Sequence, residues 1–356
     1  MSLAEAQAPA RPTAIWDPAE ARLSCLAVRD ETADTKTFSL APTDGSRVKF
    51  HAGQNLTLEW AMPDGETLHR TFTVASAPTC ATHVEITMKA QPSGYATRDM
   101  HARLRPGVSV RAYGPGGRFG LAYAPAEKVL LLGAGSGATP MMSMLRWVRD
   151  RAYDTDIAYL HAARTPADIL FADELEAIDA AVPNVSVSVI VADVPSGQSW
   201  FGPRGQLDRR WLTTLVPDAR DRETFCCGPA PFMTAMRRAL AASGQDASRY
   251  HEESFGPAPA APPPLAEASE AMSARLARSN RTVSLDPSKP ILSSLRAAGV
   301  ALPSGCKSGI CGTCRVGKSA GEVAMSHQGG LSVEQEAKGE ILACCSYPLG
   351  DVVLDL

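Results

Sequence analysis

A chain of 356 residues exceeds an ordinary single domain and suits two or three domains, each with its own buried core. Its 35 basic and 38 acidic residues leave a formal net charge of -3, which excludes a strong overall field for nucleic acid or a membrane surface. No apolar run reaches the length of a membrane span, and the Ala- and Pro-rich start lacks the parts of a secretion signal. These features predict a cytoplasmic protein with no nucleic-acid and no membrane partner.

The segment from residue 21 to residue 123 has the pattern of an antiparallel β domain. Short runs rich in β-branched and aromatic residues alternate with turn signals, which is typical of a barrel or a sandwich. The clearest runs are Lys36–Leu40, Asn55–Trp60, Thr71–Ala75 and His83–Lys89. The sequence therefore predicts a β-barrel over residues 21–123, preceded by a tail over residues 1–20.

From residue 124 to residue 255 apolar strands alternate with helical segments. The strand-like runs are VLLLGAG, IAYLHAA, VSVSVIVA and TFCCG, and helices are expected at Pro140–Arg149, near Asp173–Ala181 and before Gly244. This alternation favours a parallel sheet, because right-handed crossover helices connect parallel neighbours. We expect an α/β domain over residues 124–255.

Proline separates this domain from the end of the chain. The run GPAPAAPPP at Gly256–Pro264 forbids a helix and favours an extended linker, which is predicted over residues 256–275. Residues 276–356 then form a small third domain that holds five of the nine cysteines. Without an export signal, such clustering indicates a metal or cofactor site rather than disulfides.

Four of these cysteines have the spacing of an iron–sulfur site. Cys306, Cys311 and Cys314 form a C-x4-C-x2-C run, and Cys344 follows at a distance. Four thiolates spaced in this way hold the two bridged irons of a [2Fe-2S] cluster in plant-type ferredoxins. The glycines between them fit a loop that wraps a cluster closely. A zinc site is the alternative, although it usually uses paired C-x2-C knuckles.

Cys345 adjoins Cys344 and is the competing fourth ligand. The segment LACCSYP resembles the ferredoxin segment in which the first of the two positions binds iron. This resemblance assigns the ligand role to Cys344 and leaves Cys345 to packing. It also implies a small α+β fold of the ferredoxin-like, β-grasp type for residues 276–356.

A glycine-rich turn directly follows the first apolar strand of the α/β domain and opens a helix. It contains Gly133, Gly135, Gly137, Thr139 and Pro140. Glycines let a backbone approach a diphosphate, and a helix N-terminus supplies unpaired N–H donors. A tight turn without a ligand would have the same pattern, but FCCGP at Phe225–Pro229 ends a later strand. The two elements together resemble the nicotinamide domain of the ferredoxin-NADP reductase family.

The resemblance implies roles for the later segment as well. In that family the Cys-Gly-Pro segment lies beside the nicotinamide, which puts Cys227, with Gly228 and Pro229, near the carbon that gives up hydride. A buried small side chain is the alternative role for Cys227. The family's acidic-then-aromatic chain end matches Glu253-Ser254-Phe255, so Phe255 is expected near the flavin or the nicotinamide.

The β domain carries a motif that resembles the family's flavin motif, Arg70-Thr71-Phe72-Thr73. The guanidinium of Arg70 can pair with the flavin phosphate, Phe72 can stack on the ring system, and Thr73 can bond the N5 edge where hydride arrives. Gly94 and Thr97 match the family's diphosphate-binding segment. Thr73 and Cys227 are the predicted catalytic residues.

The order of flavin domain, nicotinamide domain and plant-type ferredoxin occurs in reductase components that feed Rieske-type oxygenases. The resemblance implies hydride transfer from NADH to a flavin and electron transfer to the [2Fe-2S] cluster. The turn at Gly114–Phe119 is similar to that of FAD-binding members, so FAD is expected, with FMN as the alternative. Arg164 is the one visible cation for the extra phosphate of NADPH, but Asp168 would repel that phosphate, so NADH is expected over NADPH.

The electron acceptor is implied by resemblance alone. The segments HAARTPADILF, GSGATPMMSM and LACCSYPLGDVVLD are similar to reductases of Rieske monooxygenases that demethylate quaternary amines such as glycine betaine or proline betaine. A di-iron epoxidase or an aromatic-ring hydroxylase is the alternative client. A zinc-binding scaffold without enzyme activity is a hypothesis of another class, against which the intact flavin and nicotinamide motifs argue.

Overall fold

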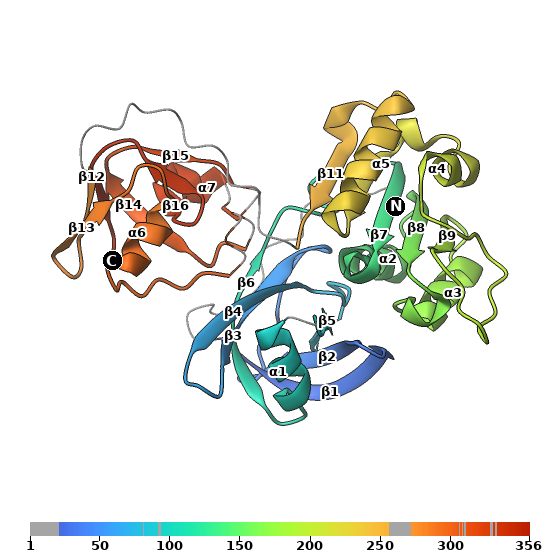
Figure 1. Ribbon diagram of the computed structural model, residues 1–356, viewed down its shortest axis with the longest axis horizontal. Coiled ribbons are helices and arrows are strands. Elements are labelled where there is room, and N and C mark those ends of the chain that lie inside the picture. Colours follow the sequence, from blue (N-terminus) through green and yellow to red (C-terminus); the bar gives the residue numbers. More distant parts are fainter. Residues whose placement is uncertain are drawn as a thin grey trace.

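The computed structural model describes residues 21–80, 82–91, 94–255, 272–305, 307, 309, 311–327, 330–331 and 333–356. The predicted tail, the predicted linker up to residue 271 and Cys306 lie outside the described residues. The chain forms three domains, and the first one lies between the other two in the view of Figure 1. No helix of the described part is long and apolar enough to cross a membrane. The cytoplasmic location stays a prediction.

The first domain is an antiparallel barrel, as the sequence predicts. Its six strands pair in the order β4-β3-β6-β1-β2-β5, and a bridge between Val74 and Ile86 brings the end of β4 to β5. Alternate side chains fill the interior, among them Leu23, Phe38 and Leu56. The elements are β1 (Arg22–Thr32), β2 (Thr35–Pro42), β3 (Asn55–Ala61), β4 (Thr67–Thr73), β5 (Val84–Lys89), α1 (Tyr95–Arg103) and β6 (Ser109–Gly116).

The second domain is a parallel sheet covered by helices on both faces (Figure 1). The strand order is β11-β10-β7-β8-β9, so the chain crosses to the other side of β7 between β9 and β10. All five strands are parallel, and their carboxyl ends therefore lie along the same edge of the sheet. The elements are β7 (Lys128–Ala134), α2 (Ala138–Arg151), β8 (Asp156–Ala163), α3 (Ala172–Ala181), β9 (Val185–Val191), α4 (Arg209–Leu215), β10 (Glu223–Cys227), α5 (Ala230–Ala242) and β11 (Tyr250–Glu253).

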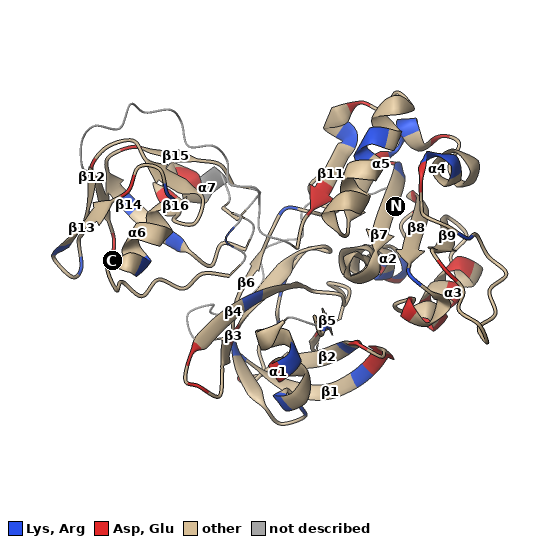
Figure 2. Ribbon diagram, viewed as in Figure 1, with Lys and Arg blue, Asp and Glu red and all other residues tan. Residues whose placement is uncertain are grey.

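The third domain is a small mixed sheet with helix α6 packed against it. Its sheet order is β13-β12-β18-β14-β16, and β15 pairs separately with β17. The elements are β12 (Met272–Leu276), β13 (Arg281–Leu285), α6 (Ile291–Ala297), β14 (Arg315–Ala320), β15 (Val323–Met325), α7 (Val333–Ala337), β16 (Glu340–Leu342), β17 (Ser346–Pro348) and β18 (Val352–Leu354). Figure 2 shows acidic and basic residues distributed over all three domains.

The start of the third domain differs from the sequence prediction. Strand β12 begins at Met272, inside the predicted linker, because Met272–Leu276 pairs with β13 on one side and with β18 on the other. The strand therefore gains ladder hydrogen bonds that local composition does not reveal. The other predicted domain boundaries stay predictions.

The barrel and the α/β domain share one hydrophobic core. Ala75 and Phe119 of the first domain belong to the same buried cluster as Met141, Met144 and Leu145 of α2. The ring of Phe119 lies edge-on to Phe225 of β10, with centroids 5.5 Å apart. Buried apolar area of this kind fixes the two domains against each other.

Candidate active site and cluster centre

Three strand ends of the α/β domain meet one strand pair of the barrel. Cys227 lies opposite Gly133 on β7 and opposite Glu253 on β11 in the parallel ladder. The Glu253 carboxylate accepts hydrogen bonds from Asn55 and Thr73, each at 3.4 Å, and these two residues are partners in the β3–β4 ladder. The structure thus brings the two predicted catalytic residues, Thr73 and Cys227, next to the same buried residue, Glu253.

Burial controls the electrostatics of this group. Glu253 is 4% exposed, and burial raises its pKa to about 8, so the carboxyl group holds its proton near neutral pH. Burial likewise raises the pKa of the Cys227 thiol well above its ordinary value, with a further contribution from Glu253. Cys227 therefore stays a neutral thiol, a group that can pack against a ring but not attack one.

One buried polar atom at this site lacks a hydrogen-bond partner among the residues that the structure describes. The Oδ1 atom of Asn55 is buried and accepts no hydrogen bond from the described residues. A buried acceptor without a partner is costly, and a bound ring with an N–H group would satisfy it. The donors and acceptors of Asn55, Thr73 and Glu253 therefore fit a flat polar ring such as a flavin.

The glycine-rich turn lies directly beside this constellation. A Cβ atom at Gly137 would lie 2.0 Å from the Cys227 carbonyl oxygen, so only glycine allows the turn to approach the end of β10 so closely. The turn forms the short helix Gly135–Gly137 and leads into α2, where Thr139 and Pro140 are buried. A glycine-rich turn that leads into a helix N-terminus is an arrangement that can bind a diphosphate.

The residues predicted to hold the flavin lie along β4 and at the start of α1. Phe72 is half-buried on β4, and Arg70 is exposed, with its guanidinium bonded to the His69 carbonyl at 2.9 Å. Gly94 caps α1, and the hydroxyl of Thr97 lies within hydrogen-bond reach of the Gly94 carbonyl at 3.5 Å. The roles of these residues in binding the flavin stay predictions.

Two further predicted residues lie at the margin of the site. Phe255, two residues after Glu253, is 48% exposed. Arg164 follows β8, donates to Asp168 at 2.5 Å and lies 3.6 Å from Asp34 of the barrel. Because both neighbours are acidic, the charge of Arg164 is already balanced within the protein.

The predicted cluster ligands that the structure describes lie in one buried loop region. Cys311, Cys314 and Cys344 are between 2% and 7% exposed, whereas no three possible ligands in the described ranges are grouped closely enough to hold a metal ion. Contact with Cys344 raises the pKa of Cys314, and hydrogen bonds from Cys314 and Cys345 lower the pKa of Cys344. Three buried cysteines in one loop region fit the ligands of an iron–sulfur cluster.

The cluster loop packs on the barrel at β3, β4 and β6. The Thr313 hydroxyl lies 2.9 Å from the Thr57 hydroxyl of β3 and 3.0 Å from the sulfur of Cys311. Thr57 is in turn 2.8 Å from Thr71 of β4. A Cβ atom at Gly116 would lie 2.8 Å from the Cys311 carbonyl oxygen, so glycine permits this approach. A predicted iron ligand thus lies directly on the flavin barrel.

Sequence reasoning missed part of this site. In the sequence, Glu253 stands out only as part of a motif, and Asn55 only as the start of a strand. The contact between Thr57 and Thr313 joins residues 256 positions apart, and no local pattern announces it. Ladder partners such as Asn55 and Thr73 could be found only once the strand register is known.

Family matches follow the three domains. Residues 25–121 match the family described as an oxidoreductase FAD-binding domain, and residues 131–238 match an oxidoreductase NAD-binding domain. Residues 274–349 match a 2Fe-2S iron-sulfur cluster binding domain. This last match favours an iron–sulfur cluster over the zinc alternative.

Curated relatives match nearly the whole chain. The glycine betaine monooxygenase reductase subunit of Pseudomonas aeruginosa is 37% identical over 356 residues, covering 96% of this chain and 97% of the relative. The stachydrine N-demethylase reductase subunit of Rhizobium meliloti is 39% identical over 345 residues, with the same coverage. The similarity therefore includes all three domains in the same order.

Solved structures show the same architecture. Phthalate dioxygenase reductase, described as a modular structure for electron transfer from pyridine nucleotides to [2Fe-2S], is 26% identical with a TM-score of 0.57, and the match covers 94% of this chain and 97% of that one. An intact type IV self-sufficient cytochrome P450 monooxygenase has a TM-score of 0.70 at 22% identity, covering 98% of this chain and 43% of that one. The latter likeness concerns the fold alone.

Proposed function

The chain belongs to the ferredoxin-NADP reductase family, in the group with a C-terminal [2Fe-2S] ferredoxin domain, and we propose that it supplies electrons to a Rieske-type monooxygenase that demethylates a quaternary amine. The observation that carries the proposal is the identity of 37% and 39% with two such reductase subunits along 96% of the chain. Glycine betaine and stachydrine, the compounds in the names of these relatives, are the proposed substrates of the client.

The chain itself is an NAD(P)H-dependent oxidoreductase whose cofactors are FAD, NADH and a [2Fe-2S] cluster. When bound, the flavin supplies the chemistry that accepts hydride and releases electrons one at a time. The protein residues bind and orient the cofactors and exclude water from the space between them. The electrons leave through the cluster to an oxygenase component.

We propose the following roles for the residues of the active site. Thr73 and Asn55 orient the flavin edge by hydrogen bonds, while the protonated Glu253 keeps a neutral donor between them. The buried thiol of Cys227 packs beside the nicotinamide. The backbone around Gly137 and the start of α2 binds the diphosphate of the dinucleotide.

The surroundings of Arg164 support NADH over NADPH. Arg164 forms ion pairs with Asp168 and with Asp34. Both would have to be broken before the guanidinium could bind an extra phosphate. The two carboxylates would also repel that phosphate. We therefore propose that the acidic residues around Arg164 disfavour NADPH.

The client reaction balances with the electrons that this chain delivers. One atom of O2 enters a C–H bond of an N-methyl group, and the other leaves as water with two protons and the two electrons from NADH. The resulting hydroxymethyl amine then releases formaldehyde and the demethylated amine. NADH oxidation and formaldehyde release should therefore occur in equal amounts.

The test is reconstitution with the oxygenase component of the glycine betaine monooxygenase of Pseudomonas aeruginosa. We expect NADH-dependent formaldehyde release from glycine betaine or stachydrine, and none when the reductase is omitted. A di-iron epoxidase component and an aromatic-ring hydroxylase component serve as the alternative clients. Turnover with either of these, with no formaldehyde from the betaines, would overturn the proposal while leaving the reductase activity itself intact.

A further inference from the structure

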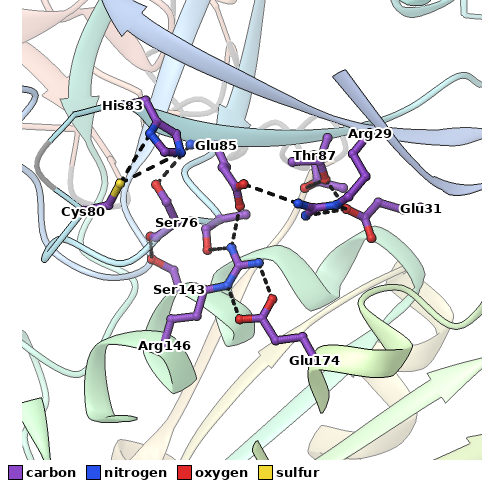
Figure 3. Close-up of polar contacts among 12 residues, drawn as sticks. Arg29, Glu31, Ser76, Cys80, His83, Glu85, Thr87, Ser143, Arg146 and Glu174 are labelled. Atoms are coloured by element: carbon purple, nitrogen blue, oxygen red, sulfur yellow. Dashed lines mark hydrogen bonds and ion pairs between the residues drawn. The ribbon is translucent and has the colours of Figure 1, made fainter. Parts of the chain in front are cut away.

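A buried guanidinium joins the barrel to the helix that follows the glycine-rich turn. Arg146 lies in the second half of α2 and is 6% exposed. Its terminal nitrogen Nη1 donates to the Ala75 carbonyl and to the Glu85 carboxylate, each at 2.8 Å. Its Nε and Nη2 donate to the Glu174 carboxylate at 2.9 and 2.5 Å. Figure 3 shows the guanidinium between Glu85 and Glu174.

These partners come from three different elements. Glu85 belongs to β5 of the barrel and is itself held by Arg29 of β1 at 3.7 Å, whereas Glu174 belongs to α3 of the other domain. A planar guanidinium can donate to both carboxylates and to a carbonyl at once. A lysine ammonium offers three donors around a single atom and cannot span this arrangement.

The segment that Arg146 binds is the direct continuation of the flavin motif. Ala75 lies two residues after Thr73, and the next carbonyl, of Ser76, accepts a bond from the buried Ser143 hydroxyl at 2.8 Å. Ser143 and Arg146 lie one turn apart on the same face of α2. The carbonyls of Ala75 and Ser76 are therefore bound by one helix face. Figure 3 shows the contact of Ser143 with Ser76.

The other end of α2 carries the dinucleotide site. The helix follows Gly137, whose backbone lies against Cys227. A helix is a stiff connection, so a shift of its Arg146 end moves its N-terminal end as well. The position of the nicotinamide relative to the flavin motif therefore depends on the contacts that Arg146 makes.

We propose that Arg146 is a positioning residue for hydride transfer, which fixes the nicotinamide site against the flavin motif through α2. The proposal rests on the proposed function, because it assumes hydride transfer at the Thr73 and Cys227 site. A displacement of about 1 Å between reacting groups can slow a reaction by about 100-fold. Loss of the Arg146 contacts therefore acts on the hydride step, and electron transfer from flavin to cluster does not depend on it.

The experiment uses the full-length protein with FAD and the cluster bound, and compares R146K with R149K. Arg149 is the matched control, since it also pairs with Glu174 and with Asp150 but makes no hydrogen bond or ion pair with the described residues of the barrel. Anaerobic stopped-flow absorbance follows flavin reduction with NADH and with NADH deuterated at the transferring position. Circular dichroism and flavin content establish that each variant is folded and loaded.

We expect R146K to slow flavin reduction by about 10-fold to 100-fold, to raise the deuterium isotope effect and to weaken the long-wavelength absorbance of the flavin–nicotinamide complex. Photoreduced flavin in R146K should still pass electrons to the cluster at the wild-type rate. R149K should behave as wild type in all four measurements. A second variant, E85Q, keeps an acceptor oxygen for Arg146 and should therefore slow flavin reduction less than R146K does.

An R146K protein that is folded and loaded but keeps the wild-type hydride rate and isotope effect would overturn the proposal. An R146K protein that slows the hydride and cluster steps equally would do the same, because that pattern indicates a merely structural role. Failure of the proposed hydride transfer would be distinguishable, because the wild-type flavin would then not be reduced by NADH. Failure of the proposed client would leave this experiment unaffected, because no oxygenase takes part in it.

Discussion

The flavin barrel meets its two neighbouring domains through very different contacts. Toward the α/β domain it shares a hydrophobic core and the ion pairs of Arg146, whose side chain is 8% exposed. Toward the ferredoxin domain the contacts include neutral hydroxyls, Thr57 with Thr313, and close approaches of the glycine backbone at Gly116 and Gly305. The first interface contains paired buried charges, and the second contains groups that water can replace.

This difference has an energetic meaning. A shift that parts the Arg146 guanidinium from its carboxylates while they stay buried leaves uncompensated charges and costs several kcal/mol, so the first interface holds one arrangement. A neutral hydrogen bond contributes only about 1 kcal/mol net, because water offers equivalent partners. Hydride transfer needs a fixed geometry, whereas a cluster that must serve both a flavin and an external oxygenase benefits from a separable contact. The two interfaces match these two demands.

The largest expected effect concerns the iron ligands of the ferredoxin domain, whose interface with the barrel can separate. Cys344→Ser should remove the rhombic low-temperature EPR signal of the reduced cluster completely, because a hydroxyl replaces an iron-binding thiolate. Cys345→Ser is the matched control and should keep that signal. If the signal instead survived in the Cys344 variant and vanished in the Cys345 variant, the assignment of the fourth ligand would be wrong.

On the fixed side, Arg146→Met should lower the free energy of unfolding by about 3–5 kcal/mol, because Glu85 and Glu174 lose the cation buried between them. Urea unfolding of the loaded protein, followed by circular dichroism, measures this loss. Arg149→Met, with a side chain that is 41% exposed, should cost no more than about 1 kcal/mol. Equal losses in the two variants would contradict the distinction between the interfaces.

The carboxyl group of Glu253 makes the fixed side sensitive to pH. Burial raises its pKa to about 8 from an ordinary value of 4.5, so the folded state holds a proton that the unfolded state releases across that window. Stability should therefore fall as pH rises from about 4.5 to about 8, by a few kcal/mol at most, since one pKa unit corresponds to about 1.4 kcal/mol.

The comparison that checks this prediction is Glu253→Gln, whose side chain does not titrate. The urea concentration at the unfolding midpoint is measured for both proteins at about pH 5.5 and about pH 8.5. The two midpoints should differ less in the glutamine variant than in the wild type. The same pH dependence in both proteins would mean that Glu253 is ionised in the folded state.

The smallest effect is expected at the hydroxyl contact. Thr313→Val removes the bond to Thr57 and the bond to the Cys311 sulfur, and should cost about 1 kcal/mol. Limited proteolysis of the segment between the second and third domains should become faster, because the ferredoxin domain leaves the barrel more often. Unchanged proteolysis would show that this hydroxyl does not hold the domain.

The parts that sequence predicts are those with local signals. The cysteine spacing, the glycine-rich turn at Gly133–Pro140 and the alternation of strands and helices each lie within a few dozen residues. Arg146 gives no such signal, since its partners Ala75, Glu85 and Glu174 lie on other elements and become neighbours only after folding. Strand β12 was missed for the same reason, because its partner β18 lies at the other end of the domain.

Anaerobic stopped-flow spectroscopy of two single variants tests the central claim most directly. Reaction with NADH should give a fast phase of flavin reduction and a second phase of cluster reduction. Because the cluster phase follows the flavin phase, its own rate is measured from photoreduced flavin. We predict that R146K slows only the flavin phase and that Gly116→Val, which places side-chain atoms against the Cys311 carbonyl oxygen, slows only the cluster phase. If either variant slowed both phases to the same degree, the barrel would not have one fixed and one separable interface.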